Sequence, residues 1–169
     1  MGDDGRYWTT VGSAGTLSAA DLAKVSLKNA VLTLGHGIAP PPATAAEDPS
    51  IIRPQISAVV RYNITPVDGL FVEGKPFVYV LQLTYRGTVR ARLVQFDYST
   101  GTETDLVHFD GSSSPASGFT TMGMETGLAT VMDFVNCAYY VEATLTASAI
   151  VTGNPAEIAA VKVYAFTKF

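Results

Sequence analysis

Alternating apolar and polar positions run through most of this chain. Between residues 77 and 85 the odd positions read Phe, Tyr, Leu, Leu and Tyr, and between 139 and 145 they read Tyr, Val, Ala and Leu. Side chains two apart on an extended strand share a face, so each segment has one buried side and one more polar side. Both segments are predicted to be β-strands.

The same alternation marks further strands. Residues 56–64 place their even-numbered apolar side chains on one face, and Pro66 with Asp68-Gly69 then predicts a turn. Segments 6–11, 24–34 and about 159–169 are rich enough in β-branched and aromatic residues to complete the predicted set.

Residues 89–109 have the pattern of a β-hairpin. Apolar residues occupy odd positions as far as Leu93 and even positions from Val94, a one-residue change of phase that predicts a β-bulge here. Ser99 to Thr102 are expected to form a tight turn in which Gly101 takes a positive φ. Residues 103–109 return as the partner strand, and 110–118 form an exposed loop.

Two short helical turns are expected. Ser18-Ala-Ala-Asp21 matches a capping box, and Asn154-Pro155-Ala156-Glu157 resembles a helix start with Asn as cap and Pro in the first position. The Pro-rich segment 35–55 is interpreted as a long extended connection across one end of the domain.

These elements predict an all-β fold over residues 1–169: one antiparallel β-sandwich domain with about seven to nine strands and one or two short helical turns. The long 35–55 connection favours a jelly-roll or Greek-key topology over a simple meander. Residues 1–11 are expected to form either an N-terminal arm or an edge strand.

Charge content narrows the possible partners. Charged residues make up 15% of the chain, against about 25% in an average soluble domain. This scarcity suggests that part of the surface is covered by other copies of the chain or by a partner, which favours a homo-oligomer or larger assembly. The net charge is −4 and no basic stripe is present, so no nucleic-acid partner is expected. Arg86, Arg90 and Arg92 are interpreted as the solvent side of a strand pair.

No signal-peptide pattern and no apolar run of about 18 residues is present, so we expect a soluble chain without membrane insertion. The localisation stays open between the cytoplasm and an extracellular or virion particle. Cys137 is the only cysteine and is interpreted as a small buried apolar residue.

Candidate metal ligands are few. His36 is interpreted as an exposed turn residue and His108 as a half-buried strand residue, and the two are not expected to share a metal. Four carboxylates around the predicted hairpin are candidates for a calcium site, although solvated carboxylates at strand ends are the simpler interpretation: Asp97, Glu103, Asp105 and Asp110.

No catalytic set emerges from the sequence. Gly12-Ser-Ala-Gly15 lacks the Gly-x-Ser-x-Gly pattern of a nucleophile elbow, and no Gly-rich phosphate loop introduces a helix. We therefore expect neither enzymatic activity nor a cofactor. The aromatic residues could pack in the core or at an interface, or form a sugar-stacking platform, with these as the principal candidates: Tyr7, Trp8, Tyr62 and Tyr98.

Two functions from different classes follow. The first is a non-enzymatic structural protein, a self-associating subunit of an oligomer, filament, surface layer or phage or virion accessory structure. The alternative is a carbohydrate- or ligand-binding β-sandwich module, with calcium as a candidate stabilising ion.

Overall fold

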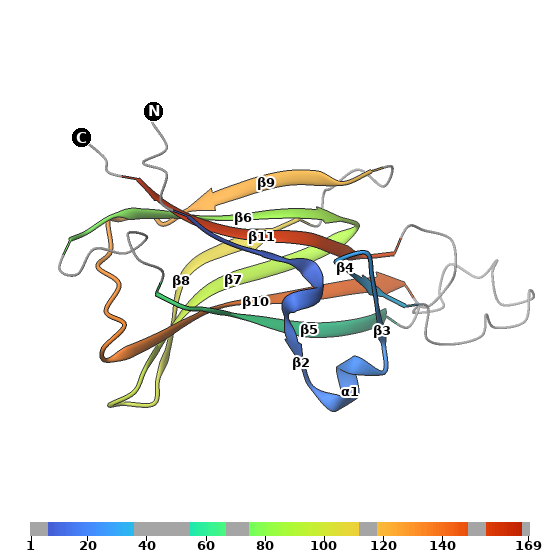
Figure 1. Ribbon diagram of the computed structural model, residues 1–169, viewed down its shortest axis with the longest axis horizontal. Coiled ribbons are helices and arrows are strands. Elements are labelled where there is room, and N and C mark those ends of the chain that lie inside the picture. Colours follow the sequence, from blue (N-terminus) through green and yellow to red (C-terminus); the bar gives the residue numbers. More distant parts are fainter. Residues whose placement is uncertain (1–6, 36–54, 67–74, 112–117, 149–154, 167–169) are drawn as a thin grey trace, which may run out of the picture.

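Two antiparallel β-sheets pack face to face in the computed structural model, which describes residues 7–35, 55–66, 75–111, 118–148 and 155–166 (Figure 1). One sheet has the order β2-β5-β10-β7-β8, made of Thr16–Leu17, Gln55–Ile64, Cys137–Ser148, Thr88–Asp97 and Glu103–Asp110. The other has the order β3-β4-β11-β6-β9, made of Val25–Lys28, Val31–Leu34, Glu157–Phe166, Val78–Arg86 and Thr120–Glu125. β1 (Tyr7–Val11) also pairs with β11.

The sheets have jelly-roll topology. Eight strands form the orders β4-β11-β6-β9 and β5-β10-β7-β8, and successive strands change sheet at every connection except the β7–β8 hairpin. The predicted all-β sandwich and its jelly-roll connectivity are confirmed. The described residues contain eleven strands, more than expected, partly because 24–34 divides into the hairpin β3–β4, with positive φ at Asn29 (51°) and Ala30 (66°).

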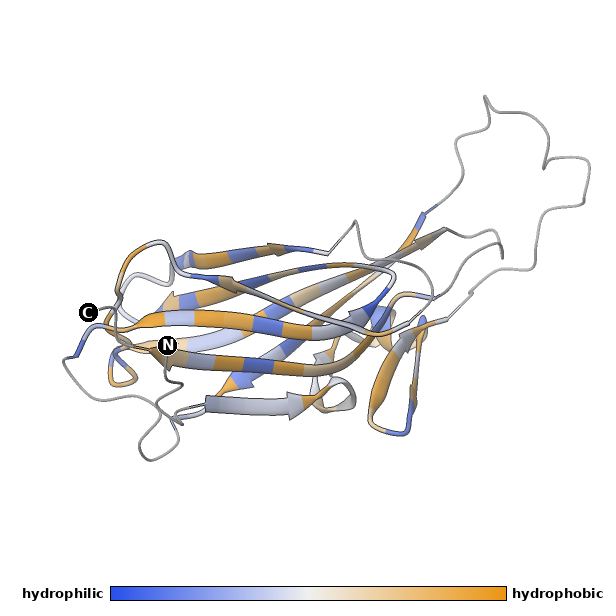
Figure 2. Ribbon diagram, turned by 90° about the horizontal axis from the view of Figure 1, so that it is seen from above, coloured by the Kyte–Doolittle hydropathy of each residue, from blue (hydrophilic) through white to orange (hydrophobic). Residues whose placement is uncertain are grey.

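Alternation along the strands builds the core. On β6, Leu81, Leu83 and Tyr85 are fully buried, and they pack with side chains such as Leu93 and Val141 of the opposite sheet. Bands of opposite hydropathy therefore follow one another along each strand (Figure 2). This periodicity fixes which side chains remain outside the sandwich.

One of the two expected helical turns is present. In α1 (Ala19–Leu22) the Ser18 hydroxyl accepts the Asp21 amide at 3.1 Å and donates to the Asp21 carboxylate at 2.9 Å, as a capping arrangement requires. The helix start predicted at 154–157 is wrong. Asn154 lies outside the described residues, and β11 already begins at Glu157 because its apolar side chains enter the core from Ile158 onward.

A second helical turn lies instead at Gly12–Ala14, where η1 joins β1 to β2. A Cβ atom on Gly12 would lie 1.7 Å from the carbonyl oxygen of Ile158, so only glycine allows this close approach of two backbones. Residues 7–11 form an edge strand, β1, which pairs with β11 of the same chain. Residues 1–6 lie outside the described part.

The 89–109 hairpin is confirmed, with Gly101 at a φ of 68°. Its bulge lies where predicted, but the extra residue belongs to the partner strand. Leu93 pairs with Val107 and Val94 pairs with Asp105, which leaves Leu106 of β8 unmatched. β7 itself pairs with β10 without a register shift. The phase of its sequence pattern changes because Val94 and Phe96 are apolar residues at outward-facing positions.

The predicted connection 35–55 and loop 110–118 fall mostly on residues 36–54 and 112–117, outside the described part. No helix among the described residues is long and apolar enough to cross a membrane.

Candidate functional site

A row of polar side chains crosses the outer face of the five-stranded sheet. Arg61 of β5 pairs with Glu142 of β10, Glu142 pairs with Arg92 of β7, and Arg92 pairs with His108 of β8. Residues directly opposite one another on adjacent strands share a face, so all four side chains stand on the same surface. The core lies beneath it, on the other side of the sheet.

The bulge at Leu106 adds more carboxylates to this surface. Val107 and Phe109 are buried in the core, so the intervening His108 and the following Asp110 face outward. Without the extra residue, Asp105 would share the inward direction of Val107. Because the bulge changes the phase of β8, Glu103 and Asp105 face outward together with His108.

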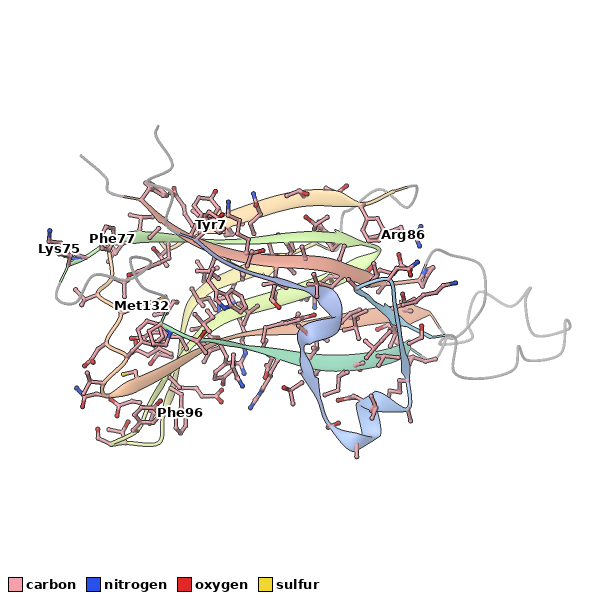
Figure 3. The ribbon with its side chains drawn as sticks, viewed as in Figure 1. Tyr7, Lys75, Phe77, Arg86, Phe96 and Met132 are labelled. Atoms are coloured by element: carbon pink, nitrogen blue, oxygen red, sulfur yellow. The ribbon has the colours of Figure 1, made fainter. Side chains whose placement is uncertain are left out.

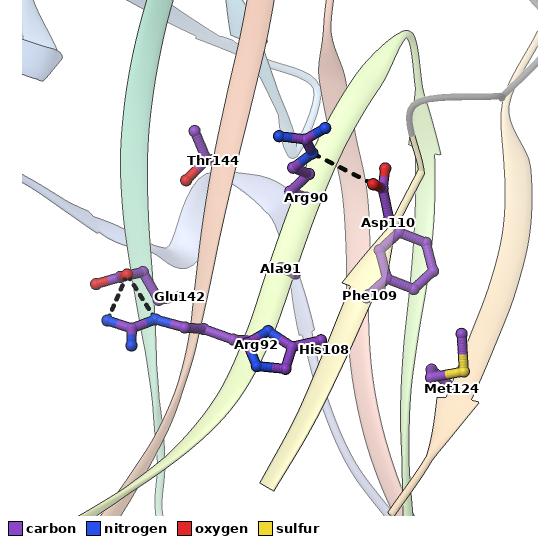
Figure 4. A pocket seen from close by; sticks show the side chains of 9 residues that line it. All are labelled: Arg90, Ala91, Arg92, His108, Phe109, Asp110, Met124, Glu142 and Thr144. Atoms are coloured by element: carbon purple, nitrogen blue, oxygen red, sulfur yellow. Dashed lines mark hydrogen bonds and ion pairs between the residues drawn. The ribbon is translucent and has the colours of Figure 1, made fainter. Parts of the chain in front are cut away.

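Glu142 holds the two arginines in place. Its Oε2 accepts the Nε–H of Arg61 at 2.7 Å, and its Oε1 accepts the Nε–H of Arg92 at 2.9 Å. Oε1 also forms an ion pair with Nη2 of Arg92 at 2.8 Å, and Figure 4 shows both contacts to Arg92. The Glu142 side chain is only 14% exposed, whereas those of Arg61 and Arg92 are 51% and 30% exposed. The carboxylate is thus the inner anchor of two more exposed guanidinium groups.

Arg92 also links this row to β8. Its guanidinium contacts Asp105 at 3.0 Å and Glu103 at 3.2 Å. Glu103 in turn accepts a short hydrogen bond from the hydroxyl of Tyr140, and the Arg61 guanidinium lies 5.0 Å from the centre of the Tyr140 ring. The result is one connected network across four strands.

The network favours the charged form of its acids. The hydrogen bond from Tyr140, with added attraction from Arg92 and Arg61, holds the pKa of Glu103 below its ordinary value. Burial, reinforced by the bond to Glu103, raises the pKa of Tyr140 to about 12. Near neutral pH, Tyr140 is therefore a donor and Glu103 an ionised acceptor.

Two shallow hollows flank the row. A hollow of about 500 Å³ lies toward β2 and α1 and is lined by Thr16, Leu17, Ser18, Asp21, Val59, Arg61, Asn63 and Glu142. A second hollow of about 360 Å³ lies toward β8 and is lined by Arg90, Ala91, Arg92, His108, Phe109, Asp110, Met124, Glu142 and Thr144 (Figure 4). Glu142 borders both, and the other residues of the row line one hollow or the other, so the row runs from one concave area to the next.

Aromatic side chains occupy the end of the surface nearest the β7–β8 turn. Phe96 is the next outward residue after Val94 on β7, and Figure 3 shows it beyond the five-stranded sheet. Tyr98 follows with 58% of its surface exposed, and its ring packs edge-on against Phe96 with centroids 6.2 Å apart. An exposed ring therefore adjoins the polar network.

The structure does not assemble the predicted aromatic platform. Tyr62 is a correction: it is 2% exposed in the core, because the even positions of β5 face inward, and its hydroxyl donates to the Gly12 carbonyl at 2.8 Å. Tyr7 and Trp8 lie on β1 in the other sheet, Tyr7 exposed and Trp8 packed against the core. Of the four candidates, only Tyr98 adjoins the outer face described above.

The predicted calcium ligands are likewise separated. Glu103 and Asp105 meet on Arg92, Asp110 pairs with Arg90 at 3.4 Å, and Asp97 accepts the amides of Ser99 and Thr100 within the hairpin turn. Within the described ranges, no three His, Cys, Asp or Glu side chains are grouped to hold a metal ion. Calcium binding stays a prediction.

The remaining single-residue expectations have mixed outcomes. His108 is exposed rather than half-buried, at 74% of its side chain, because it faces outward on the edge strand β8. His36 lies outside the described residues. Cys137 is buried, as expected.

Comparison with known proteins finds similar solved structures, and three of them are carbohydrate-binding modules at low sequence identity. No family model and no curated protein sequence matches the chain. The C-terminal CBM6 of LamC, a marine laminarinase from Zobellia galactanivorans, superposes with a TM-score of 0.44 at 6% identity, over 94% of this chain and 98% of that one.

Two further solved structures are similar at lower scores. TmCBM27, a carbohydrate-binding module described for specific mannan recognition, has a TM-score of 0.36 at 9% identity, covering 96% of this chain and 90% of its own. A mutant of CBM29-2, a family 29 carbohydrate-binding module, has a TM-score of 0.34 at 8% identity, covering 95% and 86%. The geometry of this chain's own surface must therefore carry any functional argument.

Proposed function

We propose that this protein is a non-enzymatic carbohydrate-binding β-sandwich module, and that it binds a neutral glycan on the outer face of its five-stranded sheet. The observation that carries the proposal is the connected network of Arg61, Glu142, Arg92 and Glu103, with the exposed ring of Tyr98 at one end.

Sugar hydroxyls both donate and accept hydrogen bonds. A row that alternates guanidinium donors with carboxylate acceptors can therefore satisfy adjacent hydroxyls on one sugar ring. Glu142 already fixes both arginines, so less side-chain freedom is lost when a ligand binds. The network is preorganised for a polyhydroxylated ligand.

The balance of charge favours a neutral ligand. Three arginines of this face stand against four carboxylates, namely Arg61, Arg90 and Arg92 against Glu103, Asp105, Asp110 and Glu142. Each of these groups already contacts an opposite charge. An anionic ligand such as a phosphate would meet no excess of positive charge here.

The aromatic end supplies the apolar contact that a sugar ring needs. Tyr98 exposes an aromatic surface against which the C–H face of a sugar can lie. From Arg90 of β7 to Tyr98, which directly follows the strand, the outer face extends over roughly 26 Å at about 3.3 Å per residue. The surface is thus long enough for several sugar units in a row.

A glycan array that contains neutral and acidic polysaccharides, probed at low and high salt, tests the proposal. We expect the protein to be retained on neutral glycans at both salt concentrations. A neutral glycan carries no charge, so added salt has no attraction between opposite charges to screen. Binding to acidic glycans alone, abolished by salt, would contradict it, as would no binding to any glycan. The expected role as a filament, surface-layer or virion subunit stays a prediction.

A further inference from the structure

The outer edge of the six-stranded sheet is formed by β9. This strand pairs with β6 over six residue pairs without a register shift, and no described strand lies on its other side. Glu125 is the only charged residue in the strand, which also lacks proline and lysine. Edges with no bulge, no proline and a single charge readily accept another strand.

Exposed apolar side chains gather at and after this edge. Six of the eleven large apolar residues that are exposed in the described part fall between 119 and 135, which marks this stretch as the least covered apolar region: Phe119, Met122, Met124, Leu128, Val131 and Val135. The β8 edge of the other sheet is different, since its outward residues are Glu103, Asp105, His108 and Asp110.

The two methionines point toward the inside of the sandwich. Met122 pairs with Leu83 and Met124 with Leu81, both of which are fully buried. The Tyr85 hydroxyl contacts the Met122 sulfur at 3.2 Å. Met122 and Met124 nevertheless remain 42% and 47% exposed, so the sandwich is open along β9.

We propose that a second copy of this chain closes this opening by antiparallel pairing of β9 with β9, centred on Gly123. Met122 would then face Met124 of the partner subunit, and Thr121 would face Glu125 of the partner subunit, so no like charges meet. A two-fold symmetric interface between identical subunits requires such a self-complementary patch. The methionines of both copies would continue the inner face of one extended sheet.

The pairing has a consequence for ligand binding, which rests on the proposed function. A two-fold axis between antiparallel strands runs perpendicular to the sheet, so it keeps corresponding faces on the same side. The dimer therefore presents both five-stranded sheets in one direction. Two sites on one polysaccharide chain would raise the apparent affinity without any new contact.

Sedimentation equilibrium of the full chain at micromolar concentrations tests the dimer. We expect twice the chain mass of 17.9 kDa, and for Met124→Lys a dissociation constant raised at least tenfold. Leu27→Lys is the matched control, because Leu27 is 50% exposed on β3 at the opposite edge of the same sheet, and it should leave the dimer intact. A monomeric wild type, or a dimer weakened by Leu27→Lys and not by Met124→Lys, would overturn the proposal.

A cross-link gives a second measurement that does not depend on destabilising the edge. Opposed residues in an antiparallel pair have Cα atoms about 4.5–5.5 Å apart, within disulfide range, so Gly123→Cys should form a covalent dimer under mild oxidation. Native Cys137 is buried and should not compete. A dimeric protein in which Gly123→Cys does not cross-link would overturn the β9 pairing. Tyr98→Ala should weaken glycan binding about tenfold and leave the dimer intact, so the two proposals fail separately.

Discussion

Arg92 and Glu142 lie directly opposite each other on β7 and β10, and two nitrogens of Arg92 contact the same carboxylate oxygen at 2.8 and 2.9 Å. The second oxygen of Glu142 is taken by Arg61 from the other neighbouring strand. Exposed surface ion pairs usually contribute little, but this carboxylate is mostly covered and bound on both sides. The arrangement therefore combines a structural contribution with a prepared binding surface.

Glu142→Gln should reduce the free energy of unfolding by about 1–2 kcal/mol, because it removes the charge that separates two arginines. Urea unfolding of both proteins measures the difference. Arg90→Gln is the matched control: the Arg90–Asp110 pair is 68% and 56% exposed, so its loss should cost less than about 0.5 kcal/mol. If both variants lose the same free energy of unfolding, the Arg61–Glu142–Arg92 row stabilises the fold no more than an exposed ion pair does.

The contribution of Glu103 should depend on pH in a definite direction. Its pKa in the folded protein is lowered from an ordinary value of 4.5, so its stabilising effect is fully present above pH 4.5 and is lost as pH falls through the folded pKa. Thermal unfolding of the wild type and of Glu103→Gln should differ at pH 7 and converge in acid. A gap that persists unchanged below the folded pKa would contradict the assignment.

Glu157 should contribute to stability through a largely buried pair in the other sheet. It contacts Arg86 and accepts a hydrogen bond from Thr33 at 3.1 Å, with only 10% of its side chain exposed. Because Arg86 retains 27% exposure, Glu157→Ala should cost about 2 kcal/mol, below the range for fully buried pairs. Asp110→Ala, which breaks an exposed pair, should be nearly neutral in the same denaturation experiment.

Tyr98 and Tyr7 form a matched pair for the binding proposal. Both are exposed tyrosines, at 58% and 50%, but they lie on different sheets. Tyr98→Ala should weaken glycan binding about tenfold through loss of the stacking surface, and Tyr7→Ala should leave it unchanged. Affinity electrophoresis in a neutral polysaccharide gel separates the outcomes, and the reverse order would assign the ligand to the β1 side.

The sequence allowed the strands and their faces to be predicted, because a period of two is a local property. In 56–64 the apolar residues occupy the even positions, and this phase indicates that Tyr62 is buried. Tyr98, by contrast, lies beyond the end of β7 and is exposed. The bulge was located from the phase change at Leu93 and Val94. Its assignment to Leu106 required the pairing with β8.

The candidate site itself could not be predicted in this way. Arg61 and Glu142 are separated by 81 positions, and nothing local shows that they are opposed across β5 and β10. From the sequence alone, the acidic residues of the hairpin suggest a bound cation. Their arginine partners can be identified only when the pairing register of the strands is known. At 154–157 the local Asn-Pro signal was overridden by the pairing of β11 with β6.

Chemical-shift mapping by NMR, during titration with a neutral oligosaccharide retained on the array, locates the binding surface residue by residue. We expect the perturbed amides to cluster on β5, β7, β8 and β10 around Glu142, with Tyr98 included, while those of β1, β6 and β11 stay unchanged. Perturbations confined to the six-stranded sheet would contradict a binding surface on the Arg61–Glu142–Arg92 row.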